Sequence, residues 1–446
     1  MSANRTYNTP FWFLVIGVAL ILVGRNFFAE GMFLDGVVYA CISRNMACGM
    51  GDFWHPHYTL AIGSVFHSHP PLAFGLEALM FKLFGDHLFV ERLYSLLMYI
   101  ASGWLIALIW KRTTNDMRRA WIPLLFWLAM PIVAWSAENN MLENTMAVFV
   151  LLSVYLMIVS YQQNNKIWLL LAGLSLFASF LSKGVTGLFP LVFPLVYCCF
   201  DDQRRWTQGL VDGLLLLVIM AALMGLMFLV FPASFVYMKD YIDIQLIGGG
   251  LNDATVSSRL FIVLSLLQEL IGPALILALM MIVHKLVLKR KAKVFEFPSD
   301  RRWFFIFLVF GLTGVLPIML SMKQSSFYMV AALPFFAIAL GHLFLGFVNP
   351  IGESLKQHRL WRSIFAGLAC AVLLCGLALP WLGMGRYSRD EALIKKVKEV
   401  LVTTGDEQVI GIYPSDYNQW IWHAYYMRYG KVSLDTQNNN KIQLCY

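Results

Sequence analysis

The residues of this chain that could do chemistry are few, and they stand near the ends of long apolar runs. Burying an ionisable side chain at membrane depth is costly, so such groups mark function more often there than in water. A carboxylate can serve as a general base, and a cation can stabilise a developing anion. The residues in question are Asp35, His67, His69, Glu77, Arg92, Glu138, Glu143, Lys183 and Lys323.

Four histidines in one segment raise the question of a metal. His55 and His57 are one residue apart, as are His67 and His69, and Asp52 precedes them. Imidazole and carboxylate groups together bind divalent metals such as zinc, manganese or magnesium. The spacing matches no defined ligand set, so a metal site and a polar loop without metal both stay open. His69 is also a candidate hydrogen-bond donor to a phosphate.

The elements that must position these residues are transmembrane helices. Of the 446 residues, 59% are hydrophobic and 13% are charged, fewer charges than a soluble domain keeps on its surface. Apolar runs of about 17–25 residues, the length that crosses a bilayer, recur and predict an all-α polytopic membrane protein with about eleven transmembrane helices. The predicted spans are 11–29, 88–110, 120–135, 145–161, 167–181, 184–200, 210–231, 260–283, 303–320, 327–348 and 363–383.

Lysines and arginines cluster in alternate short loops, which predicts the orientation. Positive residues near span ends stay cytoplasmic, so the N-terminus is expected inside and the tail outside. The net charge is +8, and its basic residues lie beside span ends. Anionic membrane lipid rather than nucleic acid is therefore the expected partner. The clusters are Lys111, Arg112, Arg118 and Arg119; Arg204 and Arg205; the basic residues of 285–302; and Lys356, Arg359 and Arg362.

Two outer segments, 30–87 and 232–259, are too long to be simple connections. The first is expected to form two helices, 34–48 and 70–84, each about 20 Å long and lying along the membrane surface. The second contains three consecutive glycines at 248–250 and is expected to be a flexible loop. Residues 1–383 then form the membrane domain.

The tail, 384–446, alternates helical and strand-like patterns and predicts a small α/β cap on the outer side. Its aromatic residues Trp420, Trp422, Tyr425 and Tyr426 could stack on sugar rings or pack the cap on the membrane domain, and packing is expected. Cys41, Cys48 and Cys445 also fall outside, where one disulfide is allowed and none is required.

Five stretches, in order, resemble membrane glycosyltransferases of the GT-C type, which include protein O-mannosyltransferases and lipid A aminoarabinose transferases. They are FLDGVVYACISRNMACGMGDFW, HSHPPLAFGLEALMFKLFGDHLFVERLYSLL, MLENTMAVF, FLSKGVTGLFPL and SMKQSSFYMVAALPFFAI. Each motif alone is weak, but five in order are fairly specific, and the similarity covers roughly 11–340.

The resemblance implies the GT-C fold and an inverting transfer of a sugar from a polyprenyl-phosphate donor. The acceptor would be lipid A, another lipid, a polysaccharide or a protein, at the periplasmic face of a bacterial inner membrane. Asp35 matches the family's catalytic base, and Glu143 falls where relatives carry another acid. Many relatives have Asp-Glu where this chain has Asp35 and Gly36, so a second carboxylate must come from elsewhere or be absent.

Other residues are predicted to bind the donor phosphate or the substrate, and Pro70 and Pro71 are expected to start a helix whose positive end, with His67 and His69, faces that phosphate. The candidate binding residues are His69, Arg92, Lys183, Lys323, Tyr328 and Gln245.

Each of these residues also has a structural interpretation. Asp35 could cap its helix, and Glu143 could be an exposed loop acid. Lys183 and Lys323 could extend toward headgroups, and Arg92 could anchor its span or pair with Glu91 or Asp86.

A flippase for a lipid-linked saccharide is the rival function, and an inactive, binding-only relative is a third. A coupled transporter would be expected to carry ionisable groups near the midplane of the bilayer, whereas those of this chain lie at one face. The one-sided placement therefore favours an enzyme that acts on a lipid. The sugar, the acceptor and the oligomeric state are not encoded in these motifs.

Overall fold

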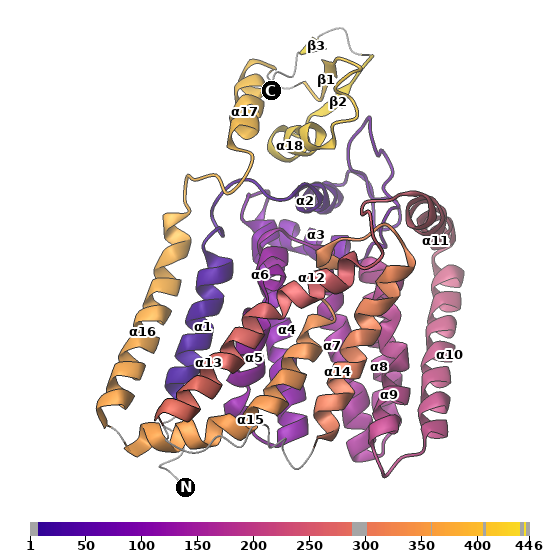
Figure 1. The fold of residues 1–446 in the computed structure, drawn as a ribbon. Coiled ribbons are helices and arrows are strands. Elements are labelled where there is room, and N and C mark those ends of the chain that lie inside the picture. Colours follow the sequence, from indigo (N-terminus) through magenta and orange to yellow (C-terminus); the bar gives the residue numbers. More distant parts are fainter. Residues whose placement is uncertain (1–7, 288–300, 358, 405–406, 438–440, 443–446) are drawn as a thin grey trace.

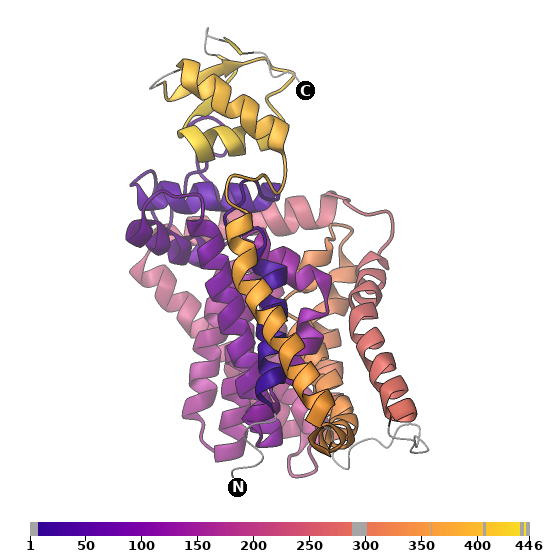
Figure 2. The same cartoon turned by 90° about the vertical axis from the view of Figure 1, so that its left-hand side faces the viewer.

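A bundle of long helices carries a small α/β unit at one end (Figures 1 and 2). The structure, a computed structural model, describes residues 8–287, 301–357, 359–404, 407–437 and 441–442. Cys445 and residues 288–300, which hold part of one basic cluster, lie outside the described residues. We call the end of the bundle that carries 30–87 and the tail the cap end.

Most of the described chain is helical. The helices of the bundle are α1 (Thr9–Gly24), α4 (Val90–Thr114), α5 (Trp121–Leu128), α6 (Pro131–Glu138), α7 (Leu142–Gln163), α8 (Ile167–Lys183), α9 (Phe193–Phe200), α10 (Trp206–Val230), α12 (Phe261–Glu269), α13 (Ile271–Val287), α14 (Arg302–Val315), α15 (Leu333–Gln357) and α16 (Arg359–Leu382), with short 3₁₀ turns η1 (Met117–Arg119), η2 (Val185–Val192), η4 (Leu316–Leu320) and η5 (Ser326–Met329).

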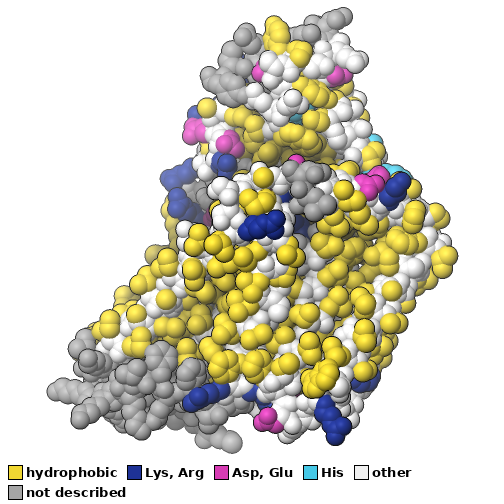
Figure 3. Space-filling view, turned by 45° about the vertical axis from the view of Figure 1, so that its right-hand side comes forward, with side chains coloured by type: hydrophobic (Ala, Val, Ile, Leu, Met, Phe, Trp, Pro, Cys, Tyr) yellow, Lys and Arg dark blue, Asp and Glu magenta, His cyan; other side chains and the backbone are white. Residues whose placement is uncertain are grey.

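The chain is a multi-pass membrane protein. Six of the described helices are long and apolar enough to cross a bilayer, and a bent pair would make a seventh, beside four shorter apolar helices. Lipid-facing side chains such as Leu214, Val218 and Leu229 of α10 are exposed, whereas α7 is largely buried inside the bundle. Apolar side chains cover most of the face of the bundle that is seen in Figure 3. The count of about eleven spans stays a prediction.

Several predicted spans are interrupted. The straight span expected over 120–135 bends by 84° between Met117–Leu128 and Pro131–Glu138. Met130 is extended and Pro131 opens α6, because proline has no N–H to continue α5 and disfavours a helical residue before it. By contrast, Phe261–Ile282 stays one apolar span across the single residue Leu270 that separates α12 from α13, and α15 begins only at Leu333, after η5.

Two helices lie across the bundle at the cap end, as the sequence predicts (Figure 2). They are α2 (Leu34–Ala47) and α3 (Leu72–Phe84). One face of α3 is exposed and apolar, through Leu79, Leu83 and Phe84, whereas Phe74 and Glu77 on the other face are buried. The apolar face is suited to lipid, and the buried face packs on the protein.

The segment 232–259 differs from the loop expected there. It forms α11 (Ala233–Tyr241) and a π-helical turn, η3 (Ile242–Asn252), which contains the three glycines. Only the residues after Asn252 are irregular before α12 begins. A wide helical turn through consecutive glycines lets the backbone approach a neighbour closely, since no Cβ intervenes.

The tail forms a small α/β unit. It contains α17 (Glu391–Thr404), β1 (Val409–Ile412), α18 (Trp420–Gly430), β2 (Ser433–Asp435) and β3 (Lys441–Ile442), with the strands parallel in the order β2-β1-β3.

The unit is docked on α2 through α18 (Figure 1). Tyr58 stacks on Trp420 with ring centroids 5.6 Å apart, and Trp422, Tyr425 and Tyr426 are buried. These aromatic rings pack the tail onto the membrane domain, as expected. Cys41 and Cys48 are free thiols, and burial raises the pKa of Cys41 to about 12.

A buried charge network joins the tail to the bundle. Arg428 of α18 donates to both carboxylate oxygens of Glu91, at 3.1 and 2.9 Å, and to Asp86 at 2.9 Å. Arg44 of α2 donates to the second oxygen of Asp86 at 3.3 Å. Glu91 therefore pairs with Arg428, and Asp86 pairs with Arg44, Arg428 and Lys431. Among the described residues neither carboxylate pairs with Arg92, which corrects one interpretation of the sequence.

We expect Arg428→Met to loosen the docked tail, because the variant leaves Glu91 buried without its cation. Removing one partner of a buried pair costs about 3–5 kcal/mol. The measurement is unfolding in detergent together with limited proteolysis of the tail. Lys395→Met is the control, since Lys395 pairs with Glu391 at the exposed surface of α17. If Arg428→Met resists protease as the wild type does, the network does not hold the tail.

Candidate functional site

A buried ion pair lies at the cap end of the helical hairpin formed by α7 and α8. Lys183, the last residue of α8, places its Nζ 3.0 Å from Oε1 of Glu143, in the first turn of α7. The Lys183 side chain is 6% exposed and that of Glu143 is fully buried. Lys183 therefore does not extend toward lipid headgroups, and Glu143 is not an exposed loop acid, although the sequence allows both interpretations.

Aromatic rings surround the ammonium group of Lys183. Its Nζ lies 5.7 Å from the ring centroid of Tyr39, 5.7 Å from that of Tyr328 and 6.0 Å from that of Phe327. Aromatic faces attract a cation, and this attraction is stronger where water is excluded. Tyr39 and Tyr328 come from α2 and η5, so the site joins elements that are distant in the sequence.

Asp35 interacts electrostatically with both members of this pair and does not cap its helix. The N-cap of α2 is Phe33 and the cap has no side-chain hydrogen bond, which excludes the structural interpretation of Asp35. Burial raises the pKa of Asp35, and the nearby cations of Lys183 and Lys323 lower it in part. The three predicted residues Asp35, Lys183 and Lys323 thus share one electrostatic site, and Glu143 belongs to it through Lys183.

Lys323 stands at the more accessible side of this site. Its Nζ lies 3.3 Å from Oδ2 of Asp253, whose side chain is 61% exposed. The π-helical turn η3 covers Lys323, since a Cβ at Gly249 would clash with its Nζ. Gln245, a predicted substrate-binding residue, lies half-buried on the same turn.

Gly36 leaves no room for a second carboxylate directly after Asp35. A Cβ at Gly36 would overlap the carbonyl oxygen of Asn139, in the turn between α6 and α7. No side chain fits at this position, so the backbone of α2 contacts the turn directly. The turn leads straight into Glu143, whose carboxylate interacts electrostatically with that of Asp35.

Arg92 is committed elsewhere. Its guanidinium donates to the backbone carbonyls of Asn26 and Gly31 and to the hydroxyl of Ser388 at 3.1 Å. These bonds tie the end of α1 to the segment that leads into the tail. Arg92 is thus an anchor in this structure, although not one that reaches into lipid.

The histidines are not brought together. His67 contacts Oδ2 of Asp240 in α11 at 2.7 Å, His55 contacts the exposed Asp52, and the carbonyl of His57 accepts from Asn45. Within the described ranges, no group of three or more His, Cys, Asp or Glu side chains converges in a way that could hold a metal ion. The predicted metal site does not fit the residues present.

His69 lies nearest to the site. Its ring packs edge-on against Tyr39 with centroids 5.7 Å apart, and its Nδ1 is buried without a hydrogen-bond partner among the described residues. Burial, with Lys183 and Lys323 nearby, lowers the pKa of His69 well below its usual value, so the imidazole is neutral. The expected phosphate cradle of His67 and His69 is thus wrong for His67, which turns to Asp240.

Two residues at or near the site, Asp240 and Tyr39, are not among the predicted site residues. Asp240 has no local signal, because its partner His67 is 173 residues away. Tyr39 could have been found, since it follows Asp35 by four residues and residues so spaced share a helix face.

Part of the chain matches a known family model, and the fold matches that of solved structures. Residues 68–231 match the family model described as dolichyl-phosphate-mannose-protein mannosyltransferase. A segment of 231 residues is 27% identical to undecaprenyl phosphate-alpha-4-amino-4-deoxy-L-arabinose arabinosyl transferase 2 of Pseudomonas fluorescens, covering 49% of this chain and 38% of that relative. The match to this curated relative therefore spans well under half of its length.

Solved structures share the fold over nearly the whole chain. ArnT from Cupriavidus metallidurans bound to undecaprenyl phosphate superposes with a TM-score of 0.66 at 14% identity, over 99% of this chain and 87% of that one. Its apo state gives a TM-score of 0.65 at 13% identity, over 97% and 86% of the two chains. The resemblance stated from the five motifs is confirmed, as a shared fold and as a sequence match over 68–231.

We expect Gly36→Ala to destabilise the protein, because the added methyl group forces α2 away from Asn139. Overpacking of this kind costs about 1–3 kcal/mol. Thermal unfolding in detergent measures it. Gly225→Ala is the matched control, since a Cβ at that position in α10 meets nothing within 4 Å, and it should leave stability equal or higher. Equal unfolding temperatures for both variants would contradict the close contact.

Proposed function

We propose that this protein is a glycosyltransferase that moves a sugar from a polyprenyl-phosphate donor to an acceptor at its cap end. The observation that carries the proposal is the geometry of Asp35, a carboxylate that caps no helix and faces the Lys183–Glu143 pair. The match to the arabinosyl transferase and the fold shared with ArnT support the class of donor.

Asp35 acts as the general base in this proposal. The acceptor oxygen attacks the anomeric carbon, its proton passes to the Asp35 carboxylate, and the bond from that carbon to the phosphate oxygen breaks with inversion. A base whose pKa is raised by burial accepts a proton more readily than an exposed aspartate does. The polyprenyl phosphate leaves with the electron pair.

Two cations are available to the leaving phosphate, and they differ in how strongly their present partners hold them. Lys183 is held between a buried carboxylate and aromatic rings, so removing it from Glu143 is expensive. Lys323 pairs with an exposed carboxylate, and exposed pairs contribute little. Lys323 is therefore the cation that exchanges its partner for phosphate, while Lys183 supplies fixed positive charge.

The cap end is the periplasmic face of a bacterial inner membrane in this proposal, with the N-terminus in the cytoplasm. Loops rich in lysine and arginine lie at the opposite end of the bundle, where the positive-inside rule places the cytoplasm. The exposed apolar face of α3 keeps the site at the level of the lipid headgroups. A lipid, polysaccharide or protein acceptor approaches from the tail side.

We expect Asp35→Asn to lower the turnover number by roughly 10²–10⁴-fold while donor binding is retained, because asparagine keeps the shape and removes the base. The measurement is transfer from labelled polyprenyl-phosphate sugars into membranes that lack this protein. Asp52→Asn, at an exposed acid, is the control. Equal transfer by wild type and Asp35→Asn would contradict the role of Asp35, and donor translocation without sugar transfer would favour the flippase.

The pH dependence of transfer provides a separate test. The base must be ionised, so the rate should fall as the pH drops through the pKa of Asp35, which burial holds above the ordinary value. Lys323 lowers this pKa, so Lys323→Gln should move the acid limb of kcat/KM to higher pH. If the acid limb stays in place or moves to lower pH, Lys323 does not lower the pKa of the catalytic base.

A further inference from the structure

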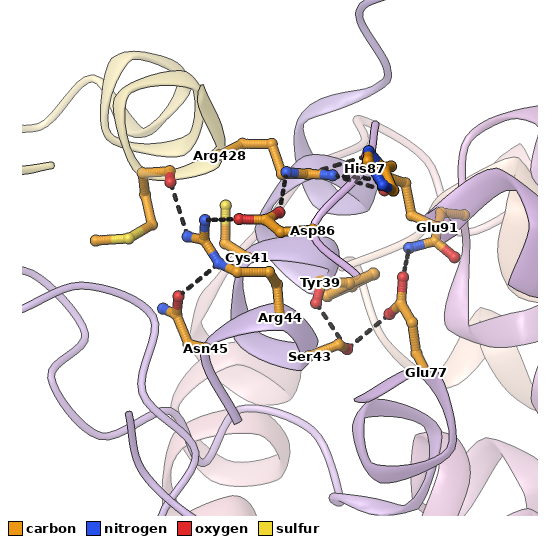
Figure 4. Close-up of polar contacts among 12 residues, drawn as sticks. Tyr39, Cys41, Ser43, Arg44, Asn45, Glu77, Asp86, His87, Glu91 and Arg428 are labelled. Carbon is orange, nitrogen blue, oxygen red and sulfur yellow. Dashed lines mark hydrogen bonds and ion pairs between the residues drawn. The ribbon is translucent and has the colours of Figure 1, made fainter. Parts of the chain in front are cut away.

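Glu77 of α3 is a buried carboxyl that the proposed reaction does not use. The residue is 1% exposed. Its Oε2 lies 2.6 Å from the hydroxyl oxygen of Ser43 in α2, and its Oε1 accepts from the side-chain amide of Asn140 at 2.7 Å. Figure 4 shows Ser43 between Glu77 and Tyr39. One carboxyl group thus joins α2, α3 and the turn between α6 and α7.

The hydrogen bonds of Ser43 indicate that the Glu77 carboxyl group is protonated. The Ser43 hydroxyl oxygen also lies 2.9 Å from the carbonyl oxygen of Tyr39, and the hydroxyl has a single proton to donate. Both contacts are satisfied when Glu77 carries a proton: Glu77 donates to Ser43, and Ser43 donates to Tyr39. Oε1 remains free to accept from Asn140.

The surroundings of Glu77 agree with this assignment. Burial raises the pKa of Glu77 to about 8, and the carboxylate of Glu91 in α4 raises it, whereas Ser43, Asn140 and Arg428 of α18 lower it. Tyr94 of α4 is the further titratable group that interacts with Glu77. A protonated carboxyl at neutral pH avoids an uncompensated charge in this interior.

The turn that Glu77 holds connects both carboxylates of the site. Asn139 accepts from the backbone N–H of Phe33 at 2.7 Å, beside Asp35, and its carbonyl contacts Gly36. Asn140 has a φ of 51° and leads into α7, which carries Glu143. Movement of this turn changes the separation of Asp35 from Glu143 and Lys183.

We propose that Glu77, in its protonated form, is a positioning residue that clamps α2 to the turn between α6 and α7 and so sets the distance of Asp35 from the Lys183–Glu143 pair. The catalytic consequence rests on the proposed function, whereas the clamp itself does not. The role also explains why a short helix, α3, stands beside the site: it carries the clamp on its buried face and contacts lipid with the other.

Substitutions at Glu77 test the clamp through transfer. Glu77→Gln reproduces the protonated acid, because its amide donates to Ser43 and its carbonyl accepts from Asn140, so it should restore wild-type kcat. Glu77→Leu should lower kcat by roughly 10²-fold with a smaller change in KM, since a shift of about 1 Å in a reacting group has that effect. Lys82→Gln, at an exposed position of α3, is the matched control.

Asn140→Gly is the second variant if Glu77→Leu does not fold. Glycine adopts the positive φ at this position without strain, and it removes the side chain whose amide donates to Glu77. It should also lower kcat more than KM. A Glu77→Leu or Asn140→Gly variant with wild-type kcat overturns the positioning role, and a Glu77→Gln variant as slow as Glu77→Leu overturns the protonated form.

Unfolding at different pH tests the clamp without any sugar transfer. The pKa of Glu77 rises from 4.5 to about 8 on folding, so the native state binds the extra proton in that interval and stability falls as the pH rises through it. The unfolding temperature of the wild type should fall by several degrees relative to Glu77→Gln from about pH 6 to about pH 9.

Parallel curves for the two proteins would overturn the protonated clamp. If the wild type shows no transfer from any polyprenyl-phosphate sugar, the proposed function fails, and the comparison of unfolding temperatures still decides the protonation of Glu77.

Discussion

A buried ion pair, Lys183 with Glu143, is the interaction around which the cap end is organised. Two charges are expensive to remove from water, and they stay ionised only when each compensates the other at close range. The hairpin of α7 and α8 meets this need because its open end brings the two residues together. Asp35 adds a second carboxyl group beside this pair, and Lys323 adds a cation that is itself paired with Asp253.

The position of α2 depends on contacts along its whole length. Its C-terminal half is held by the tail, through Arg44 on the carbonyl of Met427 at 2.8 Å and the thiol of Cys41 on the carbonyl of Ala424 at 3.4 Å. Its N-terminal half contacts Asn139. Because α2 is held at both ends, the tail contributes to the position of Asp35 without contacting it.

The sequence predicts those parts of the molecule that local chemistry determines. Helices α2 and α3 follow from apolar patterns between turn residues, and the α/β tail from its alternation of patterns. The 84° bend before Pro131 and the π-helical turn at 248–250 escape prediction, because proline and glycine mark a break without giving its geometry. Arg92 shows the same limit, since only the fold shows that its partners are backbone carbonyls.

The candidate site is predictable where it rests on residue type and order, as for Asp35, Glu143, Lys183 and Lys323. It is not predictable where a residue acts through a distant partner. The pairing of His67 with Asp240 removes a predicted ligand, and the close contact between Gly36 and Asn139 explains why position 36 carries no second acid. Both depend on packing between segments that are far apart in the chain, which no local pattern reveals.

The network around Arg428 also imposes an order on biosynthesis. Glu91 and Arg428 are 337 residues apart. Chains grow at about 5–20 residues per second, so Glu91 is made roughly 17 to 67 s before its partner exists. During that interval the later helices of the bundle, α5 to α16, are synthesised, while the Glu91 carboxylate lacks the cation that pairs with it in the folded protein. The cap end is therefore the last part of the molecule to close, although its acids are among the first residues to be made.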